Sequence, residues 1–167
     1  MIELLILVTL IDEKSTIYRI RQNLEKKYGI FLNISFGSIH PAIKKLESKK
    51  LVSAKKSISQ GGQRSSVYSI TSTGKAYFTE LMLDELPENP LLAGQLINIK
   101  LMSINYLKDE QKNIVKNSII NYLELRKISS KNLISGQDKN FDDLQIKFIN
   151  YNIGNQSDFI NWIKSNI

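Results

Sequence analysis

Cysteine is absent from this chain of 167 residues, and histidine occurs once, at His40. Without cysteine there is no disulfide framework, no thiolate nucleophile and no thiolate metal site, and a single histidine argues against the usual zinc sites. Only three prolines and eight glycines are present, which excludes collagen-like and linker-type chains. With 42% hydrophobic residues, the chain has enough apolar side chains for one domain, or for two small ones that share a core.

The motifs that carry enzyme chemistry are missing as well. The sequence contains no phosphate-binding loop, no dinucleotide fingerprint and no constellation of paired carboxylates. The run Ser72-Thr73-Gly74-Lys75 fits S-x-x-K as text, but no second motif accompanies it, and we assign it to the end of a strand. We therefore predict a protein that is not an enzyme and that needs no cofactor.

The apolar start of the chain is predicted to be a helix rather than an export signal or a membrane span. The segment MIELLILVTLI has no basic residue before its apolar run, contains Glu3, and is followed by Asp12 and Glu13. It is also too short to cross a bilayer. Its leucine, valine and isoleucine residues recur at helical spacing. We expect a first helix here and a cytoplasmic protein.

Positive charge is concentrated in the first half of the chain. There are 23 Lys+Arg against 16 Asp+Glu, which gives a formal net charge of +7. Residues 1–83 hold thirteen bases and six acids, whereas residues 84–167 hold ten of each. Because the whole excess lies in residues 1–83, we expect that half to meet a polyanion. The division predicts two domains, residues 1–83 and residues 84–167.

A third helix in the first half presents polar and basic side chains outward. Its start is left open between Ser35 and Ser38, with Pro41 near the beginning in either case. Hydroxyl and imidazole groups near its N-terminus suit contacts with base edges, and its lysines suit contacts with phosphates. The candidate residues on this helix are Ser35, Ser38, His40, Lys44, Lys45 and Lys49.

Two strand-like runs, residues 52–58 and 66–71, flank a glycine-bearing basic segment and predict a β-hairpin. Three helices followed by a basic hairpin is the element order of a winged helix-turn-helix. In that fold the third helix enters the major groove of DNA and the hairpin, or wing, follows the backbone. We expect Gln63 and Arg64, in and beside the hairpin tip, to contact DNA there.

The third-helix string SFGSIHPAIKKLE (residues 35–47), followed by Lys50-Leu51-Val52, resembles the signature of the phenolic-acid-decarboxylase regulator (PadR) family. That signature runs roughly S-P-G-S-L-Y-P-A-L-x-x-L-E, then G-L-V. The resemblance continues through the wing to residues 67–75, where the family has a Y-x-L-T-x-x-G pattern, and it is dense from about Leu4 to Lys75.

Two departures from the family pattern matter. The family often has H-G-Y at the start of the second helix, where this chain has Thr16-Ile17-Tyr18, and its tyrosine before the proline is His40 here. The resemblance implies a DNA contact from Tyr18 and a preferred operator that differs from the usual one. It also implies a repressor whose release follows the binding of a small molecule or a partner protein.

The second half is predicted to be helical throughout, with helices from Pro90, from Asp109 and from about Asp142. The last two carry two apolar stripes each, although a helix in a small domain needs only one buried face. Partner helices from a second copy would cover the extra stripe, so we predict a homodimer through residues 84–167. The residues expected at the dimer interface are Leu92, Leu96, Val115, Ile119, Leu123, Phe148, Phe159 and Trp162.

A polar notch interrupts the stripes of the last helix at Gly154-Asn155-Gln156. We expect a kink or break there, with Ser157 as the cap of the continuation. A polar lining for a ligand pocket is the alternative.

Together these features predict a mainly α protein, with a winged helix-turn-helix followed by an all-helical dimerisation domain. The predicted function is sequence-specific regulation of transcription, as a repressor that binds a palindromic operator in double-stranded DNA as a homodimer. The alternative is a winged-helix module that binds protein, or a co-regulator without its own operator. The basic outer face of the third helix favours DNA, because a protein-binding face would be apolar or acidic.

Overall fold

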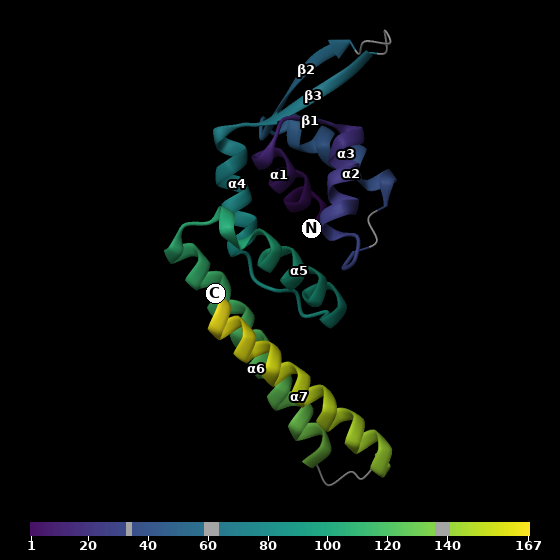
Figure 1. The fold of residues 1–167 in the computed structure, drawn as a ribbon, viewed down its shortest axis with the longest axis vertical. Coiled ribbons are helices and arrows are strands. Elements are labelled where there is room, and N and C mark those ends of the chain that lie inside the picture. The colour runs from purple at the N-terminus through teal and green to yellow at the C-terminus, as the bar shows by residue number, and fades with distance from the viewer. Residues whose placement is uncertain (33–34, 59–63, 136–140) are drawn as a thin grey trace. The chain divides into compact units, whose positions relative to one another are not determined.

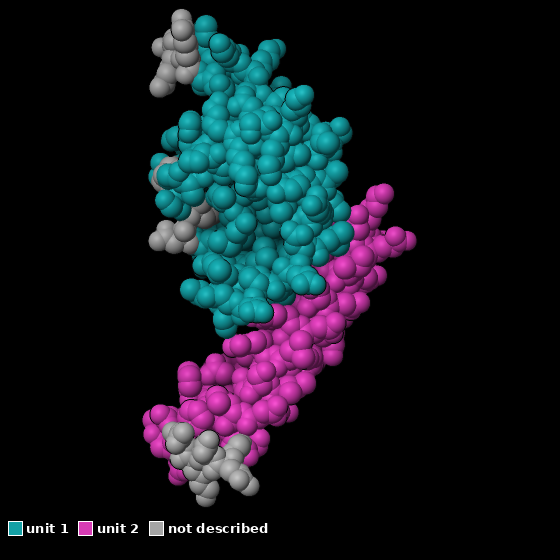
Figure 2. All heavy atoms as spheres, turned by 180° about the vertical axis from the view of Figure 1, so that it is seen from behind, with its two compact units in different colours: residues 1–106 teal, residues 107–167 magenta. Residues whose placement is uncertain are grey.

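The computed structural model describes residues 1–32, 35–58, 64–135 and 141–167 (Figure 1). The chain forms two compact units, residues 1–106 and 107–167, shown in teal and magenta in Figure 2. The fold is mainly helical with one small antiparallel sheet, which confirms the predicted fold class.

Unit 1 has the element order of a winged helix-turn-helix followed by further helices. The second helix is capped by Thr16, whose Oγ1 accepts a hydrogen bond from the backbone N–H of Arg19. The elements are α1 (Ile2–Asp12), β1 (Ser15–Thr16), α2 (Ile17–Tyr28), α3 (Phe36–Ser48), β2 (Val52–Ile58), β3 (Arg64–Ile70), α4 (Ser72–Leu83), α5 (Pro90–Ser103) and the 3₁₀ helix η1 (Ile104–Tyr106).

Helix α1 is the centre of unit 1. Every residue from Leu4 to Leu10 is buried, and the helix contacts α2, α3, α4 and β3. A helix that is apolar on all sides needs neighbours on all sides. Thr9, the polar residue in this run, is accommodated because its hydroxyl donates to the backbone carbonyl of Leu5 at 3.0 Å.

Helix α3 begins at the earlier of the two predicted positions, with Ser35 as its N-cap residue. Pro41 therefore lies inside the helix, where its missing N–H leaves one carbonyl of the preceding turn without its helical partner. The first turn is closed by a bond from the backbone N–H of Ser38 to the carbonyl of Ser35 at 3.2 Å.

The sheet has the strand order β1-β3-β2, and all its pairs are antiparallel. Strand β2 has the predicted bounds, and β3 begins two residues before the predicted run. Strand β1 was not predicted: Ser15 lies opposite Tyr68 and Thr16 opposite Val67. This short strand attaches the start of α2 to the wing.

Helix α4 was also not predicted, because its first turn contains Ser72, Thr73 and Gly74, which are poor helix formers. The assignment of that run to the end of a strand is wrong. Thr71 caps the helix, since its Oγ1 accepts a bond from the N–H of Gly74 at 3.0 Å. Glycine is needed here because a Cβ at position 74 would lie 2.0 Å from the carbonyl oxygen of Leu51.

Lys50 links α3 to the wing in a left-handed backbone conformation, with φ of 58°. The N–H of Lys50 donates to the carbonyl of Glu47, and the N–H of Leu51 donates to that of Leu46, both at 2.9 Å. These two bonds form a Schellman motif, in which glycine is the usual residue at the left-handed position. The lysine occupies the position at which the PadR signature has glycine.

Unit 2 consists of α6 (Asp109–Ser135) and α7 (Asp143–Asn166), which pack side by side (Figure 1). The Nζ of Lys116 near the start of α6 donates to the carbonyl of Lys164 near the end of α7 at 3.3 Å, so the helices are antiparallel. A capping box between Asp142 and Gln145 begins α7 at the predicted place.

Helix α7 runs through the polar notch without interruption, so the predicted break at Gly154-Asn155-Gln156 is wrong. Gly154 has open space around its Cβ position, and a glycine inside a helix weakens it without necessarily ending it. Ser157 does not cap a new helix, because its hydroxyl donates to the carbonyl of Ile153 one turn earlier. Within the described residues, no helix is long and apolar enough to cross a membrane.

Of the two apolar stripes on each helix of unit 2, one is buried and the other exposed. The buried residues are Val115, Ile119, Leu123, Ile153, Ile160 and Ile163, and the exposed ones include Ile114, Leu125, Ile128, Leu144, Phe148, Tyr151 and Trp162.

Packing and charge divide the chain at different positions. The packed units separate after Tyr106, whereas the charge changes at residue 83. Helix α5 belongs to unit 1 because the hydroxyls of Ser103 and Tyr28 form a buried hydrogen bond of 2.9 Å. The buried ammonium of Lys100 also donates to the carbonyl of Asp84, at the end of α4.

Replacing Gly74 by alanine is expected to lower the free energy of unfolding by about 1–3 kcal/mol, because the added methyl group meets the carbonyl of Leu51. Gly94→Ala in α5 is the matched control, since no described atom lies within 4 Å of its Cβ position. That variant should gain up to about 1 kcal/mol from helix propensity. Chemical denaturation measures both, and an unchanged or raised stability of Gly74→Ala would contradict the packing described.

Lys50→Gly is expected to raise the free energy of unfolding by about 1 kcal/mol, because glycine adopts the left-handed conformation without steric cost. Lys50→Ala removes the same side chain and keeps the strain, so it should not be stabilised. Thermal unfolding of the two variants separates backbone strain from loss of the lysine, and equal midpoints would show that the backbone at this position is not strained.

Candidate nucleic-acid interface

A groove of about 610 Å³ is lined by residues from three elements of unit 1: the start of α2, one flank of α3, and the wing strand β3. We call it the α2–α3–wing groove. Its lining residues are Thr16, Ile17, Tyr18, His40, Lys44, Ser65, Ser66 and Tyr68.

Backbone pairing holds the walls of this groove in place. The pairing of Thr16 with Val67 fixes the start of α2 beside β3, and Thr16 then caps α2 with its side chain. Tyr68, which lies opposite Ser15, is buried and contributes to the groove from below the wing. The groove is therefore preformed by secondary structure rather than by mobile side chains.

The groove exposes hydrogen-bonding groups and one fixed positive charge. Tyr18 is 64% exposed, and its hydroxyl accepts a bond from the side-chain amide of Gln22 at 3.1 Å. Lys44 forms a 2.8 Å ion pair with Glu47, one turn further along α3. The hydrogen bond to Glu47, followed by the nearby Tyr68, raises the pKa of Lys44, so this ammonium stays charged at neutral pH. His40 is exposed and lines the same groove.

The structure brings Tyr18, His40 and Lys44 together from the set proposed on sequence grounds, and it separates the others. Ser35 and Ser38 line a different hollow of about 420 Å³, beside Met1, Ile2, Leu5, Leu32 and Gln95. The hydroxyl of Ser38 is also engaged, since it donates to the carbonyl of Ser35 at 2.6 Å.

Lys45 and Lys49 lie on the flank of α3 that faces α1 and α4. The Nζ of Lys45 is 2.6 Å from a carboxylate oxygen of Glu3, and the Nζ of Lys49 lies 5.6 Å from the centre of the Tyr77 ring. Arg64 begins strand β3 opposite Ile58, which places its backbone near the hairpin tip. Gln63 lies outside the described residues.

Sequence reasoning did not select several residues of the groove, namely Thr16, Ile17, Ser65, Ser66 and Tyr68. The alignment of Thr16-Ile17-Tyr18 with the family's H-G-Y motif was the signal for the first two, and the tyrosine of the Y-x-L-T-x-x-G pattern was the signal for Tyr68. Neither signal shows that strand β1 brings these residues onto one surface.

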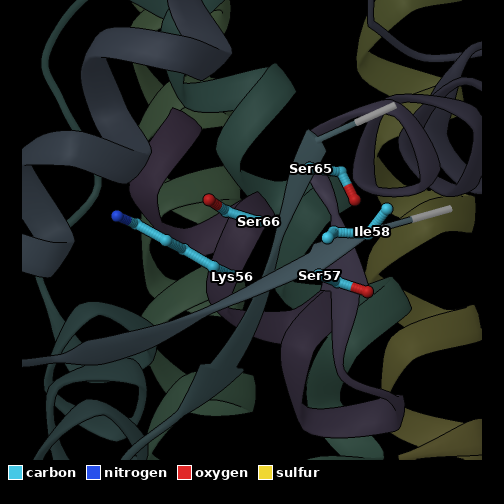
Figure 3. A pocket seen from close by; sticks show the side chains of 5 residues that line it. All are labelled: Lys56, Ser57, Ile58, Ser65 and Ser66. Carbon is cyan, nitrogen blue, oxygen red and sulfur yellow. The ribbon is translucent and has the colours of Figure 1, made fainter. Parts of the chain in front are cut away.

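A third hollow, of about 450 Å³, lies on the wing and is lined by Lys56, Ser57, Ile58, Ser65 and Ser66 (Figure 3). Lys56 pairs with Ser66 and Ser57 with Ser65, so each pair shares one face of the hairpin. Figure 3 shows Lys56 and Ser66 pointing to one side and Ser57 and Ser65 to the other. The wing thus offers an ammonium and hydroxyls, the groups that commonly contact phosphate.

Metal chemistry finds no support in the part of the chain that the structure describes. No group of three or more His, Cys, Asp or Glu side chains there is placed to hold a metal ion.

Three solved structures are among those similar to this chain. Bacillus subtilis PadR in complex with operator DNA is 14% identical, with 98% of this chain and 94% of that chain covered and a TM-score of 0.48. The protein smu.1604c from Streptococcus mutans is 20% identical, with 98% and 96% covered and a TM-score of 0.45. A PadR family transcription regulator from Clostridium difficile is 28% identical over 46% of this chain and 78% of that chain, with a TM-score of 0.41. No curated protein sequence matches the chain significantly.

The family model matches the part of the chain that forms the winged helix-turn-helix. Residues 6–80 match the Transcriptional regulator PadR-like family, from within α1 to within α4. This match confirms the resemblance seen in the third-helix string and the wing. It also confirms that the chain is not an enzyme, because the family consists of regulators. Residues 6–80 belong to the PadR-like family of transcriptional regulators.

Proposed function

We propose that this regulator binds a palindromic operator in double-stranded DNA as a homodimer and represses transcription from it in the cytoplasm. The observation that carries the proposal is the α2–α3–wing groove, which joins the exposed flank of the third helix to the wing on one preformed surface. In a winged helix-turn-helix those two elements are the ones that meet the major groove and the adjacent backbone.

Within the groove, His40 and Tyr18 supply groups that can approach base edges, and Lys44 supplies a charge for a phosphate. Lys56 extends the basic surface along the wing, and Arg64 remains a candidate at the start of β3. Ser35 and Ser38 remain candidates through the N-terminal turn of α3, although both line the neighbouring hollow. Gln63 remains a candidate at the hairpin tip.

The dimer part of the proposal rests on the exposed apolar stripe of unit 2. Phe148 is 64% exposed and Trp162 is 50% exposed, and Phe159 stacks on Trp162 with ring centres 6.2 Å apart. Exposed large apolar side chains that recur along a pair of helices favour an interaction site there. Leu92 and Leu96 on α5 add apolar area that is not fully covered. A second copy covers such a stripe with its own identical stripe about a two-fold axis.

Val115, Ile119 and Leu123, also expected at the interface, are buried within a single chain. In the proposed dimer they support the interface from beneath, by holding the α6–α7 pair together. The dimer can hold its two winged helix-turn-helix units at a spacing that fits the operator or at one that does not. A small molecule or partner protein that binds the second form better would release the dimer from DNA.

A module that binds protein through the same surface is the competing function. Salt dependence separates the two, because neutralisation of phosphates releases counterions from DNA. With DNA from the region upstream of the chain's own gene, we expect affinity to fall at least about tenfold between 50 and 200 mM salt, which corresponds to two or more neutralised phosphates. A gel-shift titration measures this, and binding that is absent or insensitive to salt would refute the DNA proposal.

The double variant Lys44→Glu with Arg64→Glu is expected to abolish operator binding while the dimer stays intact. It places negative charge on the third helix and on the wing, where the proposal places phosphates. Size-exclusion chromatography with light scattering checks the dimer, and unchanged affinity would contradict the assignment of these two elements.

The double variant Phe148→Glu with Trp162→Glu is expected to dissociate the dimer and to leave the helices folded, because both side chains are exposed in the single chain. Ile119→Ala is the contrasting variant, because it truncates a fully buried side chain. It should lower the free energy of unfolding by about 2–5 kcal/mol. Sedimentation equilibrium and circular dichroism separate the two effects. A double variant that still sedimented as a dimer would place the interface elsewhere.

A further inference from the structure

A polar network joins α1, α3 and α4 on the flank of α3 that lies outside the groove. Glu3 in the first turn of α1 is its centre, with a side chain only 14% exposed. One carboxylate oxygen lies 2.6 Å from the Nζ of Lys45, and the other accepts a hydrogen bond of 2.9 Å from the hydroxyl of Tyr77. Both oxygens of this mostly buried carboxylate are therefore engaged by side chains from two other helices.

The charge states support a fixed network. Burial alone would raise the pKa of Glu3, but the hydrogen bonds from Lys45 and Tyr77 and the positive charges of Lys45 and Lys49 outweigh it, and the pKa is lowered. Burial, together with the hydrogen bond to Glu3, raises the pKa of Tyr77 to about 12. At neutral pH Glu3 is thus an acceptor only, and the phenol of Tyr77 a donor.

Tyr77 reaches a second lysine of α3 through its ring, since the Nζ of Lys49 lies 5.6 Å from the ring centre. Lys45 and Lys49 are one turn apart, so one carboxylate and one phenol hold two successive turns of the same helix face. Lys44 precedes Lys45 by one residue and therefore points about 100° away around the helix, into the groove.

We propose that Lys45 and Lys49 are positioning residues that fix the orientation of α3 through Glu3 and Tyr77, and that they do not neutralise operator phosphates. This inference rests on the proposed DNA-binding function. It divides the basic face of α3 into a DNA-contacting flank with His40 and Lys44 and an anchored flank with Lys45 and Lys49. A helix in the major groove can contact particular base edges only if its orientation is fixed. The anchored flank therefore contributes to discrimination between DNA sequences.

Three matched variants test this division: Lys44→Gln, Lys45→Gln and Lys49→Gln. Each removes one positive charge from α3, so their long-range electrostatic effects are alike. Affinity is measured for the upstream-region duplex and for a scrambled duplex of equal length, at several salt concentrations. Lys44→Gln should weaken binding to both duplexes and reduce the salt slope by about 0.9 per chain.

Lys45→Gln and Lys49→Gln should leave the salt slope unchanged and weaken binding of the scrambled duplex less than Lys44→Gln does. They should weaken binding to the upstream duplex by about three- to tenfold, because only specific binding depends on the orientation of α3. A loss of stability without misplacement of α3 would lower binding of both duplexes in proportion, so the ratio of the two affinities separates positioning from folding.

For Glu3→Gln the two interpretations of Lys45 predict opposite changes in operator affinity. If Lys45 contacts phosphate and Glu3 merely competes for it, the variant frees the lysine, and binding tightens with a steeper salt slope. If Glu3 positions α3, the upstream duplex binds about three- to tenfold more weakly at an unchanged slope. Tyr77→Phe keeps the ring over which Lys49 lies and loses only the bond to Glu3, so it should reproduce the weaker binding in part.

The salt dependence of binding distinguishes a failure of the DNA-binding proposal from a failure of the positioning role. A wild-type chain that shows no salt-dependent binding to the upstream duplex overturns the proposed function. A wild-type chain that binds, with Lys45→Gln reducing the salt slope as Lys44→Gln does, overturns only the positioning role. Should Glu3→Gln fail to fold, Lys45→Gln still decides, because that side chain is 59% exposed and its replacement leaves the core intact.

Discussion

The pairing of two residues, Ser15 and Thr16, with the third strand is the constraint on which the rest of the functional surface depends. Through it the start of α2 lies against the wing, at Tyr68 and Val67. A hairpin alone is only marginally stable, and a third strand anchors this one to the helical body. Without that anchor the start of α2 would not line the same groove as α3 and the wing.

The net charge of +7 is less informative than the partners of the individual lysines. Lys27 pairs with Asp12 at the end of α1, and Lys45 pairs with Glu3 at its beginning. Lys44 forms an exposed pair with Glu47, which is the kind that contributes little stability and yields readily to a phosphate. The same residue type therefore serves two purposes on one face, as an anchor where a buried acid meets it and as a contact where the acid is exposed.

Features set by local sequence could be predicted, and features set by distant contacts could not. The bounds of β2, the helix starts at Pro90 and Asp143, and the two stripes of unit 2 follow from caps, prolines and periodicity, and the structure has them. Strand β1 is two residues long and exists only because β3 lies beside it. Helix α4 begins with weak helix formers that Thr71 and the close approach of Gly74 to Leu51 compensate. The pairing of Glu3 with Lys45 joins residues 42 positions apart, which no local pattern indicates.

The absence of cysteine makes a direct test of the central claim possible, because a single introduced thiol can be labelled without competition. Ser66→Cys is a nearly isosteric change in the lining of the α2–α3–wing groove, and a DNA-cleaving iron chelate attached there reports which DNA lies beside it. On the upstream-region duplex we expect two symmetric sets of cuts, separated by about one helical turn as the paired half-sites are. Binding of the labelled protein without any cleavage of the duplex would contradict the claim that this groove faces DNA.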